Sequence, residues 1–178
     1  MTTQNKMQFS TPQDKLLFMK YALPCASTLV RRGVVAQAQV DGWIKEVSQG
    51  KAPTEPAELV FKVAYAMCTT LAKAADKKSI DAETIREYFL FKHAEVVDER
   101  FKLMKDFNPT DCKTRTGKVI DVGADSALVR TAIGERWYRA VFVGGVEKNR
   151  NVVVHFDFIV ELITDSVADK MNTAMVGK

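Results

Sequence analysis

The apolar positions of this chain follow two different periods, and the change between them lies near residue 110. Before it, apolar residues recur at the three- and four-residue spacing of amphipathic helices. After it, they alternate with polar residues in short runs separated by glycines, which is typical of strands. We therefore expect an α+β protein with a helical module over residues 1–110. Residues 111–178 should form a small antiparallel β-barrel domain of OB-like type with a short C-terminal helix.

Capping residues and prolines mark several helix boundaries. Thr11 followed by Pro12 predicts a helix start, because threonine caps the first turn and proline suits the first helical position. Pro24 should break this helix, since it removes a backbone donor. Further helices are predicted over 25–32, 34–47, 56–75 and 82–105, and a terminal helix from Thr164 to about 171. The stretch 108–110, Asn-Pro-Thr, ends the helical module and is the predicted domain boundary.

Four short runs of β-branched and aromatic residues predict the strands of the barrel. They cover residues 119–122, 127–129, 137–143 and 151–156, with Gly-Ala-Asp at 123–125 as a tight turn. A parallel connection needs a crossover of about a dozen residues or more. Because the strands follow one another so closely, we expect an antiparallel sheet that curls on itself.

Composition narrows the class of protein. A hydrophobic fraction of 47% is sufficient for a buried core. No run approaches the roughly 20 apolar residues of a membrane span, and the polar start lacks the apolar segment of a secretory signal, so we expect a cytoplasmic protein. The net charge of +4 is too small to indicate nucleic-acid binding. The three cysteines show no CxxC spacing, so neither a disulfide framework nor a four-cysteine zinc site is indicated.

Cys112 and His155 are the candidate metal-binding residues. Cys112 precedes Lys113 and Arg115, cations that would lower the pKa of a nearby thiol. His155 closes a run of valines, and strand alternation points its ring to the same face as Val153. A sulfur and an imidazole suit late first-row metals, but two ligands are an incomplete site that a substrate, a partner or a metal complex would have to complete. The alternatives are an ordinary linker cysteine and a structural histidine.

The other cysteines and the second histidine are expected to have structural roles. Cys25 and Cys68 lie on apolar helical faces and are predicted to be buried in the core. His93 lies between Lys92 and Glu95 and is predicted to be an exposed helix residue. No Ser/His/Asp set, carboxylate pair or phosphate-loop motif has a spacing that indicates catalysis. We therefore predict that the protein is not an enzyme.

An ordered set of short motifs runs through the last third of the chain. In order, these are a cysteine, a Gly-Lys-Val-Ile strand, an Ala-Leu-Val strand, a glycine and a Val-His pair with an aromatic residue after it: Cys112, 117–120, 127–129, Gly134, Val154, His155 and Phe158. In this order and spacing the stretch resembles the HypC/HupF family of small hydrogenase-assembly chaperones. Thr116 stands where the family usually has proline, and Cys112 is internal, whereas the family's cysteine becomes the first residue.

The resemblance implies a non-enzymatic metallocentre-assembly chaperone or partner-binding scaffold of the hydrogenase-maturation type. In that family the cysteine and histidine handle an iron carbonyl-cyanide unit and dock the hydrogenase large subunit. It implies that Cys112 and His155 bind metal, that an iron complex is bound transiently, and that the partner is a metalloenzyme subunit or an assembly factor. The residues that we expect to contact the partner are Lys118, Arg136, Trp137, Phe156 and Phe158.

A second hypothesis is an RNA- or single-stranded-DNA-binding barrel with a helical dimerisation module. Basic and aromatic residues interleave along the predicted strands, and barrels of this size bind single strands by stacking and charge. The apolar sets 16–19 and 88–91 are wider than one core-facing stripe requires. They predict contact with a partner or a homodimer, unless these helices are buried on several sides.

Overall fold

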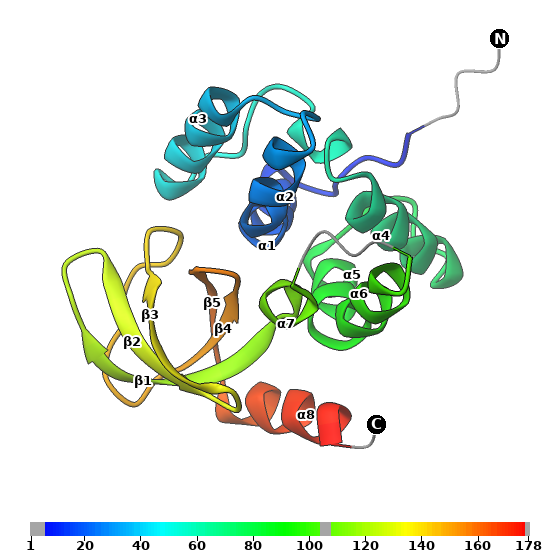
Figure 1. Ribbon diagram of the computed structural model, residues 1–178. Coiled ribbons are helices and arrows are strands. Elements are labelled where there is room, and N and C mark those ends of the chain that lie inside the picture. The colour runs from blue at the N-terminus through cyan, green and yellow to red at the C-terminus, as the bar shows by residue number, and fades with distance from the viewer. Residues whose placement is uncertain (1–5, 104–107, 177–178) are drawn as a thin grey trace, which may run out of the picture.

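The computed structural model describes residues 6–103 and 108–176 and arranges them as helices packed on a β-barrel (Figure 1). The helical elements are α1 (Pro12–Ala22), η1 (Leu23–Cys25), α2 (Ala26–Arg31), α3 (Gln37–Ser48), η2 (Ala57–Leu59), α4 (Lys62–Ala74), α5 (Ala82–Arg86), η3 (Glu87–Lys92), α6 (His93–Phe101) and α7 (Pro109–Cys112). The strands are β1 (Arg115–Val122), β2 (Ser126–Thr131), β3 (Gly134–Arg139), β4 (Asn151–His155) and β5 (Phe158–Ile163), followed by α8 (Asp165–Val176). The α+β class, the barrel and the C-terminal helix are confirmed.

The predicted capping residues shape the first helices. The Thr11 hydroxyl oxygen accepts a hydrogen bond from the Asp14 backbone N–H at 3.1 Å, and Pro12 opens α1. Pro24 converts the end of this helix into the 3₁₀ turn η1 and separates α1 from α2. No helix in the part of the chain that the structure describes is long and apolar enough to cross a membrane.

The long helix predicted over 82–105 is interrupted, and its predicted end lies outside the described residues. The π-helical segment η3 separates α5 from α6. Such segments widen the helix and leave backbone groups to be satisfied by other partners. The buried Thr114 hydroxyl donates to the Phe89 carbonyl oxygen at 2.6 Å, which anchors η3 to the chain just before β1.

The five strands close in the order β1-β2-β3-β5-β4, with β4 pairing again with β1. Four of the five pairs are antiparallel, as predicted. The prediction of an entirely antiparallel sheet is wrong at the β3–β5 contact, which is parallel and pairs Arg139 with Phe158. The loop 140–150 and strand β4 lie between β3 and β5 along the chain, and together they provide the long crossover that a parallel pair needs.

Strand β4 is buried on both faces, because the helices cover the outside of the barrel there. Val152 and Val154 pack in the barrel interior, whereas Val153 belongs to the core shared with the helices. His155 also faces the helices, so the prediction that it lies on the same side as Val153 is confirmed.

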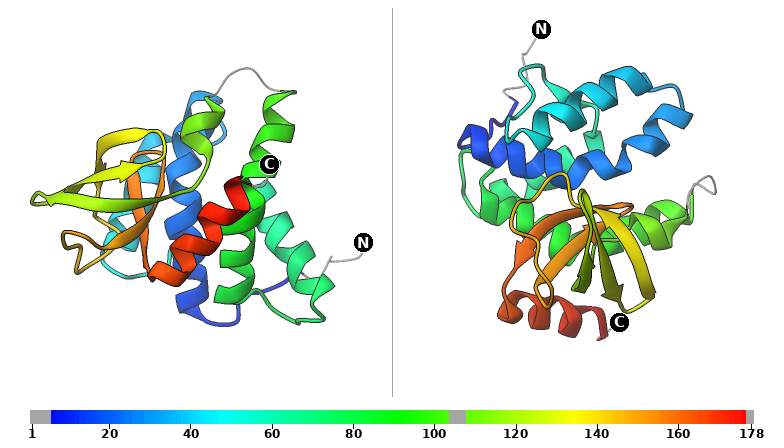
Figure 2. Two further views of the ribbon diagram at one scale, coloured as in Figure 1. Left: turned by 90° about the horizontal axis from the view of Figure 1, so that it is seen from below. Right: turned by 90° about the vertical axis from the view of Figure 1, so that its left-hand side faces the viewer.

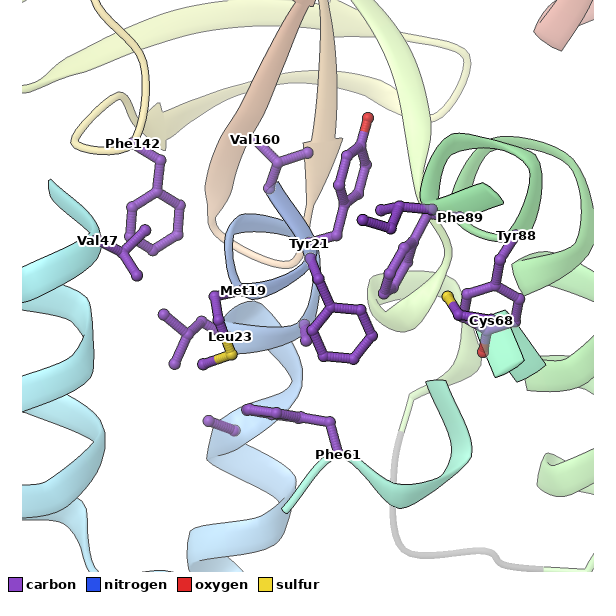
Figure 3. Close-up of a cluster of buried hydrophobic side chains, with 14 of the residues drawn as sticks. Met19, Tyr21, Leu23, Val47, Phe61, Cys68, Tyr88, Phe89, Phe142 and Val160 are labelled. Atoms are coloured by element: carbon purple, nitrogen blue, oxygen red, sulfur yellow. The ribbon is translucent and has the colours of Figure 1, made fainter. Parts of the chain in front are cut away.

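The helices and the barrel share one hydrophobic core. Figure 3 shows Phe142 and Val160 of the barrel part beside helical residues such as Val47 and Tyr21. The division of the chain into modules 1–110 and 111–178 stays a prediction. In the folded protein, the two parts are packed against each other.

The wide apolar sets of the helical part contribute to this core. Phe18 and Met19 in the first set, and Tyr88 and Phe89 in the second, are almost completely buried. Burial on several sides therefore explains their width. Self-association of the protein stays a prediction.

Helix α8 packs at one end of the barrel, as Figures 1 and 2 both show, where it contacts β1, β4 and η3. The Thr116 hydroxyl of β1 donates to the Asn172 side-chain oxygen of α8 at 2.5 Å. This helix therefore ties the C-terminal part of the chain back to the first strand.

Gly117 of β1 allows close packing inside the barrel, and its replacement tests this packing. A Cβ at Gly117 would lie 2.3 Å from the Val129 Cγ1 atom, and Val129 is fully buried. We expect Gly117→Ala to lower the free energy of unfolding by roughly 1 to 3 kcal/mol in urea denaturation, because the strands must move apart. Gly144→Ala is the matched control, because open space surrounds Gly144. Equal stability of the two variants would contradict this account.

Candidate metal centre

Four cysteine and histidine side chains from distant parts of the chain meet where the helices cover the barrel. We call Cys25, His93, Cys112 and His155 the Cys-His cluster; their ligand atoms all lie within 4.8 Å of one another. The chain contains only three cysteines and two histidines, so the cluster gathers all of them except Cys68. These four side chains together could hold a metal ion.

Each member of the Cys-His cluster lies at the end of an element, where the backbone changes direction. Cys25 closes the 3₁₀ turn at Pro24, and His93 is the first residue of α6, directly after the π-helical segment. Cys112 ends the short helix α7, and His155 ends β4. The cluster therefore depends on the breaks between elements, and three of its members come from the helical elements.

A hydrogen bond to a backbone carbonyl group orients the His155 ring. Its Nδ1 lies 2.7 Å from the Tyr21 carbonyl oxygen, to which an N–H donates. Nε2 then faces the cluster, 3.4 Å from the Cys25 sulfur and 2.8 Å from the Cys112 carbonyl oxygen. A carbonyl acceptor at one ring nitrogen commonly orients the other nitrogen of a histidine that binds metal. A metal ion at Nε2 would replace the contact with the Cys112 carbonyl.

The turn after His155 ties its strand to the segment that carries Cys112. Phe156 has a φ of 50°, a left-handed conformation that is uncommon for a bulky residue. Its N–H donates to the Asp111 carbonyl oxygen at 3.1 Å. The Arg136 guanidinium donates to the Phe156 carbonyl oxygen at 2.5 Å and also pairs with Asp111 and Asp157. These contacts hold the backbone beside both cluster residues in place.

The electrostatics of the cluster favour a thiolate at Cys112. The hydrogen bond from the Cys25 thiol, followed by those from His155 and His93, lowers the Cys112 pKa well below its ordinary value. The same contact with Cys112, together with burial, raises the pKa of Cys25. Burial lowers the pKa of His93, which keeps its imidazole neutral. In the metal-free protein, one thiolate and one neutral imidazole are thus already in the form that metals bind.

Two of the donor spacings in the Cys-His cluster match those of a tetrahedral site. Bond lengths of about 2.3 Å to sulfur and 2.0–2.1 Å to nitrogen place two thiolates about 3.8 Å apart, and a thiolate about 3.5 Å from an imidazole nitrogen. The Cys25 and Cys112 sulfurs are 4.0 Å apart, and the Cys25 sulfur is 3.4 Å from His155 Nε2. In addition, His93 Nδ1 is buried without a hydrogen-bond partner. The Cys25 to Cys112 and Cys25 to His155 spacings therefore match those around a tetrahedral ion such as Zn²⁺, and all four ligand atoms lie within 4.8 Å of one another.

One side of the Cys-His cluster is open to a cavity of about 540 Å³. Cys25, His93 and Cys112 lie in its wall, whereas His155 is fully buried behind them. A bound metal ion would therefore be approachable from the cavity side.

The structure brings Cys112 and His155 together, as a joint site requires; that they bind a metal stays a prediction. The expectation that His93 is exposed is wrong, because its side chain is only 5% exposed and packs on Tyr88 and Phe89. Cys25 is half-buried in the cavity wall, whereas Cys68 is buried as predicted. The rarity of cysteine and histidine in this chain is the signal that could have pointed to all four residues.

The residues predicted to contact a partner differ in their exposure. Lys118 is exposed and Trp137 is 51% exposed, so both are available on the barrel surface. Arg136 and Phe156 take part in the turn contacts beside the cluster. Phe158 is buried and stacks on Phe142 with ring centroids 4.7 Å apart, so it offers little surface to a partner.

Comparison with known proteins adds no family assignment. No protein-family model matches the chain, and no curated protein matches it. The Cys-His cluster is therefore the feature of this protein that points to a function.

Alkylation of the metal-free protein should occur first at Cys112. Only the thiolate form of a cysteine reacts with the alkylating reagent. At pH values well below the pKa of an ordinary thiol, the alkylation rate of that thiol therefore falls about tenfold for each unit by which the pH is lowered. With its lowered pKa, Cys112 should react with iodoacetamide at a nearly constant rate from about pH 8 down to about pH 6. Cys25→Ala removes the hydrogen bond that contributes most to the lowering of this pKa, so the Cys112 pKa should rise and the alkylation rate at low pH should fall.

Peptide mapping by mass spectrometry would follow the alkylation of each cysteine. Cys68 is the internal control, because burial raises its pKa to about 12 and it should remain unmodified in the folded protein. A steep pH dependence at Cys112 in the unchanged protein would contradict the thiolate assignment.

Proposed function

We propose that the protein is a non-enzymatic metal carrier in metallocentre assembly, which holds a late first-row metal ion or an iron complex in the Cys-His cluster. The observation that carries this proposal is a group of four donor side chains whose ligand atoms lie within 4.8 Å of one another, three of them in the wall of a cavity. A purely structural zinc ion is enclosed by its four ligands. A carrier must instead leave its cargo within reach of the molecule that delivers or receives it.

The resemblance to the HypC/HupF chaperones supports this role. The barrel, which carries the resemblance, contributes His155, and Cys112 lies directly before it; the helical part adds Cys25 and His93. The helices thus supply two further ligands to a pair that would otherwise be incomplete. On this proposal, cargo can be held before any partner binds, and a metalloenzyme subunit or assembly factor then receives it.

Proton release should accompany metal binding. Cys25 is a thiol at neutral pH, because its pKa is raised by its contact with Cys112 and by burial. It must lose its proton to bind a metal, so the metal competes with a proton there. Metal affinity should therefore increase with pH up to the pKa of Cys25. Above that pKa the Cys25 thiol is already ionised in the metal-free protein, and no further increase is expected from this residue.

Cobalt(II) binding tests the four assigned ligands. Reduced, metal-free protein titrated with Co²⁺ should develop the visible bands of tetrahedral cobalt and thiolate-to-metal charge-transfer bands, with one ion bound per chain. We expect Cys25→Ser, His93→Ala, Cys112→Ser and His155→Ala each to weaken binding by at least about tenfold, the range in which even residues that only support a ligand act.

Cys68→Ala is the matched control, because it removes the one cysteine outside the cluster and should leave the spectrum unchanged. Circular dichroism checks that each variant remains folded. Octahedral cobalt spectra, or full affinity in the Cys25 and His93 variants, would contradict the four-ligand site.

A carrier should also release its metal to a competitor that reaches it through the cavity. Exchange of bound Zn²⁺ with a small chelator should be faster in the folded protein than expected for an enclosed structural site. Exchange that requires global unfolding would favour a structural ion and would contradict the carrier role.

The exposed Trp137 supports a second candidate function, a single-strand-binding barrel of OB-like type. Its ring is 51% exposed on β3, and base stacking on an aromatic side chain is typical of such proteins. An oligonucleotide whose binding weakens steeply with salt, and is lost in Trp137→Ala, would favour this alternative. Binding that is absent at low salt would remove it.

A further inference from the structure

The cavity beside the Cys-His cluster has the size and the walls of a small-molecule site. Its volume of about 540 Å³ lies within the range of roughly 300 to 1,000 Å³ that is usual for such sites. Apolar side chains from α2, α6 and the connection between η2 and α4 form much of the wall: Leu29, Val60, Phe61, Val96 and Val97. A ligand with an apolar body would bury that body against these side chains.

Four basic side chains line this cavity. Arg31, Arg32, Lys62 and Arg100 line it, and among its described lining residues there is no aspartate or glutamate. Arg31, Arg32 and Lys62 are exposed, which places them toward the solvent side of the cavity. The charge pattern therefore favours an anion near the entrance.

The start of helix α4 adds backbone donors to the same region. Lys62, Val63 and Ala64 are its first three residues, and all three line the cavity. The preceding residue, Phe61, provides no side-chain hydrogen bond to cap the helix. The first N–H groups of a helix have no partner within the helix, and its dipole places a partial positive charge there. Such helix starts bind carboxylates and phosphates.

Another part of the wall carries a polar atom that lacks a hydrogen-bond partner. His93 Nδ1 is buried without a hydrogen bond, and the His93 side chain, 5% exposed, lines the cavity. Cys112 lies close to His93 in this part of the wall. The exposed basic residues and the first N–H groups of α4 are in the other part, so the charged end of a ligand belongs at the start of α4 and its other end near His93.

We propose that this cavity binds a small organic anion: an apolar or aromatic body that carries one carboxylate, phosphate or sulfonate group. The anionic group lies at the start of α4 between Arg32 and Lys62, and the apolar body lies along the wall toward His93. Binding does not require a metal. If the cluster holds metal as proposed above, the same ligand covers Cys25 and Cys112 and shields the cargo; this consequence alone rests on the proposed function.

Two fluorescent probes of similar shape test the inference on the metal-free full-length protein. Anilinonaphthalene sulfonate carries the anionic group, and phenylnaphthylamine has the same aromatic body without it. We expect the sulfonate to bind saturably at one site per chain and about tenfold more tightly than the neutral probe, the size of effect that a few charge contacts produce.

Two sets of variants test separately how much the basic residues and the cavity volume contribute to probe binding. The double variant Arg32→Glu and Lys62→Glu should weaken the sulfonate about tenfold and leave the neutral probe nearly unchanged. Glutamate at the first position of α4 suits the helix dipole, so this variant should fold. Lys118→Glu is the control, because it makes the same change of charge as either of these substitutions alone, but on β1, away from the cavity. Ala64→Phe fills the cavity and should weaken both probes.

Three outcomes would contradict the proposed anion site. Equal affinity for the two probes, or sulfonate binding unaffected by the double variant, would show an apolar pocket without an anion site and would overturn it. Sulfonate binding that survives Ala64→Phe in a folded protein would place the probe elsewhere and would also overturn it. Because the assay contains no metal, loss of the metal-binding proposal would leave these outcomes unchanged.

Discussion

The arrangement of the whole molecule depends on one buried imidazole. His155 is fully buried, and its two ring nitrogens face the carbonyl oxygens of Tyr21 in α1 and Cys112 in α7. A buried polar group is costly unless it is hydrogen-bonded, so β4 can dock against these helices in very few ways. A second polar contact acts beside it: the Glu161 carboxylate of β5 accepts hydrogen bonds from the Tyr21 hydroxyl and the Arg86 guanidinium. An apolar core alone would permit sliding between the helices and the barrel, whereas these directional contacts fix their relative position.

Features that depend on neighbouring residues could be predicted from the sequence. The helix start at Thr11 and Pro12 and the break at Pro24 follow from local backbone chemistry, and both occur in the structure. The facing of His155 and Val153 toward the same side follows from the period of a strand. The approach of Cys112 to His155 could also be predicted. Cys112 lies shortly before β1, His155 ends β4, and these two strands are paired.

Features that depend on long-range packing could not be predicted in this way. Nothing local distinguishes η3 from the α-helix on either side, yet this π-helical segment directly precedes His93 and its place in the cluster. Cys25 looks like an ordinary apolar-face cysteine until α7 and β4 are placed beside it. The parallel β3–β5 contact likewise requires the path of the intervening strand to be known. In each case, one residue has a role only because of partners more than ten positions away.

The spread of the Cys-His cluster from residue 25 to residue 155 has a consequence for biosynthesis. A chain leaves the ribosome from its N-terminus, and its early part begins to fold first. Cys25 and His93 emerge early and Cys112 later, but the imidazole of β4 emerges only after most of the barrel has been made. A nascent chain that has emerged only as far as α7 therefore holds two sulfurs and one imidazole without the ligand that completes them. The full donor set exists only in chains whose barrel has been synthesised and docked, so the cluster distinguishes finished molecules from unfinished ones.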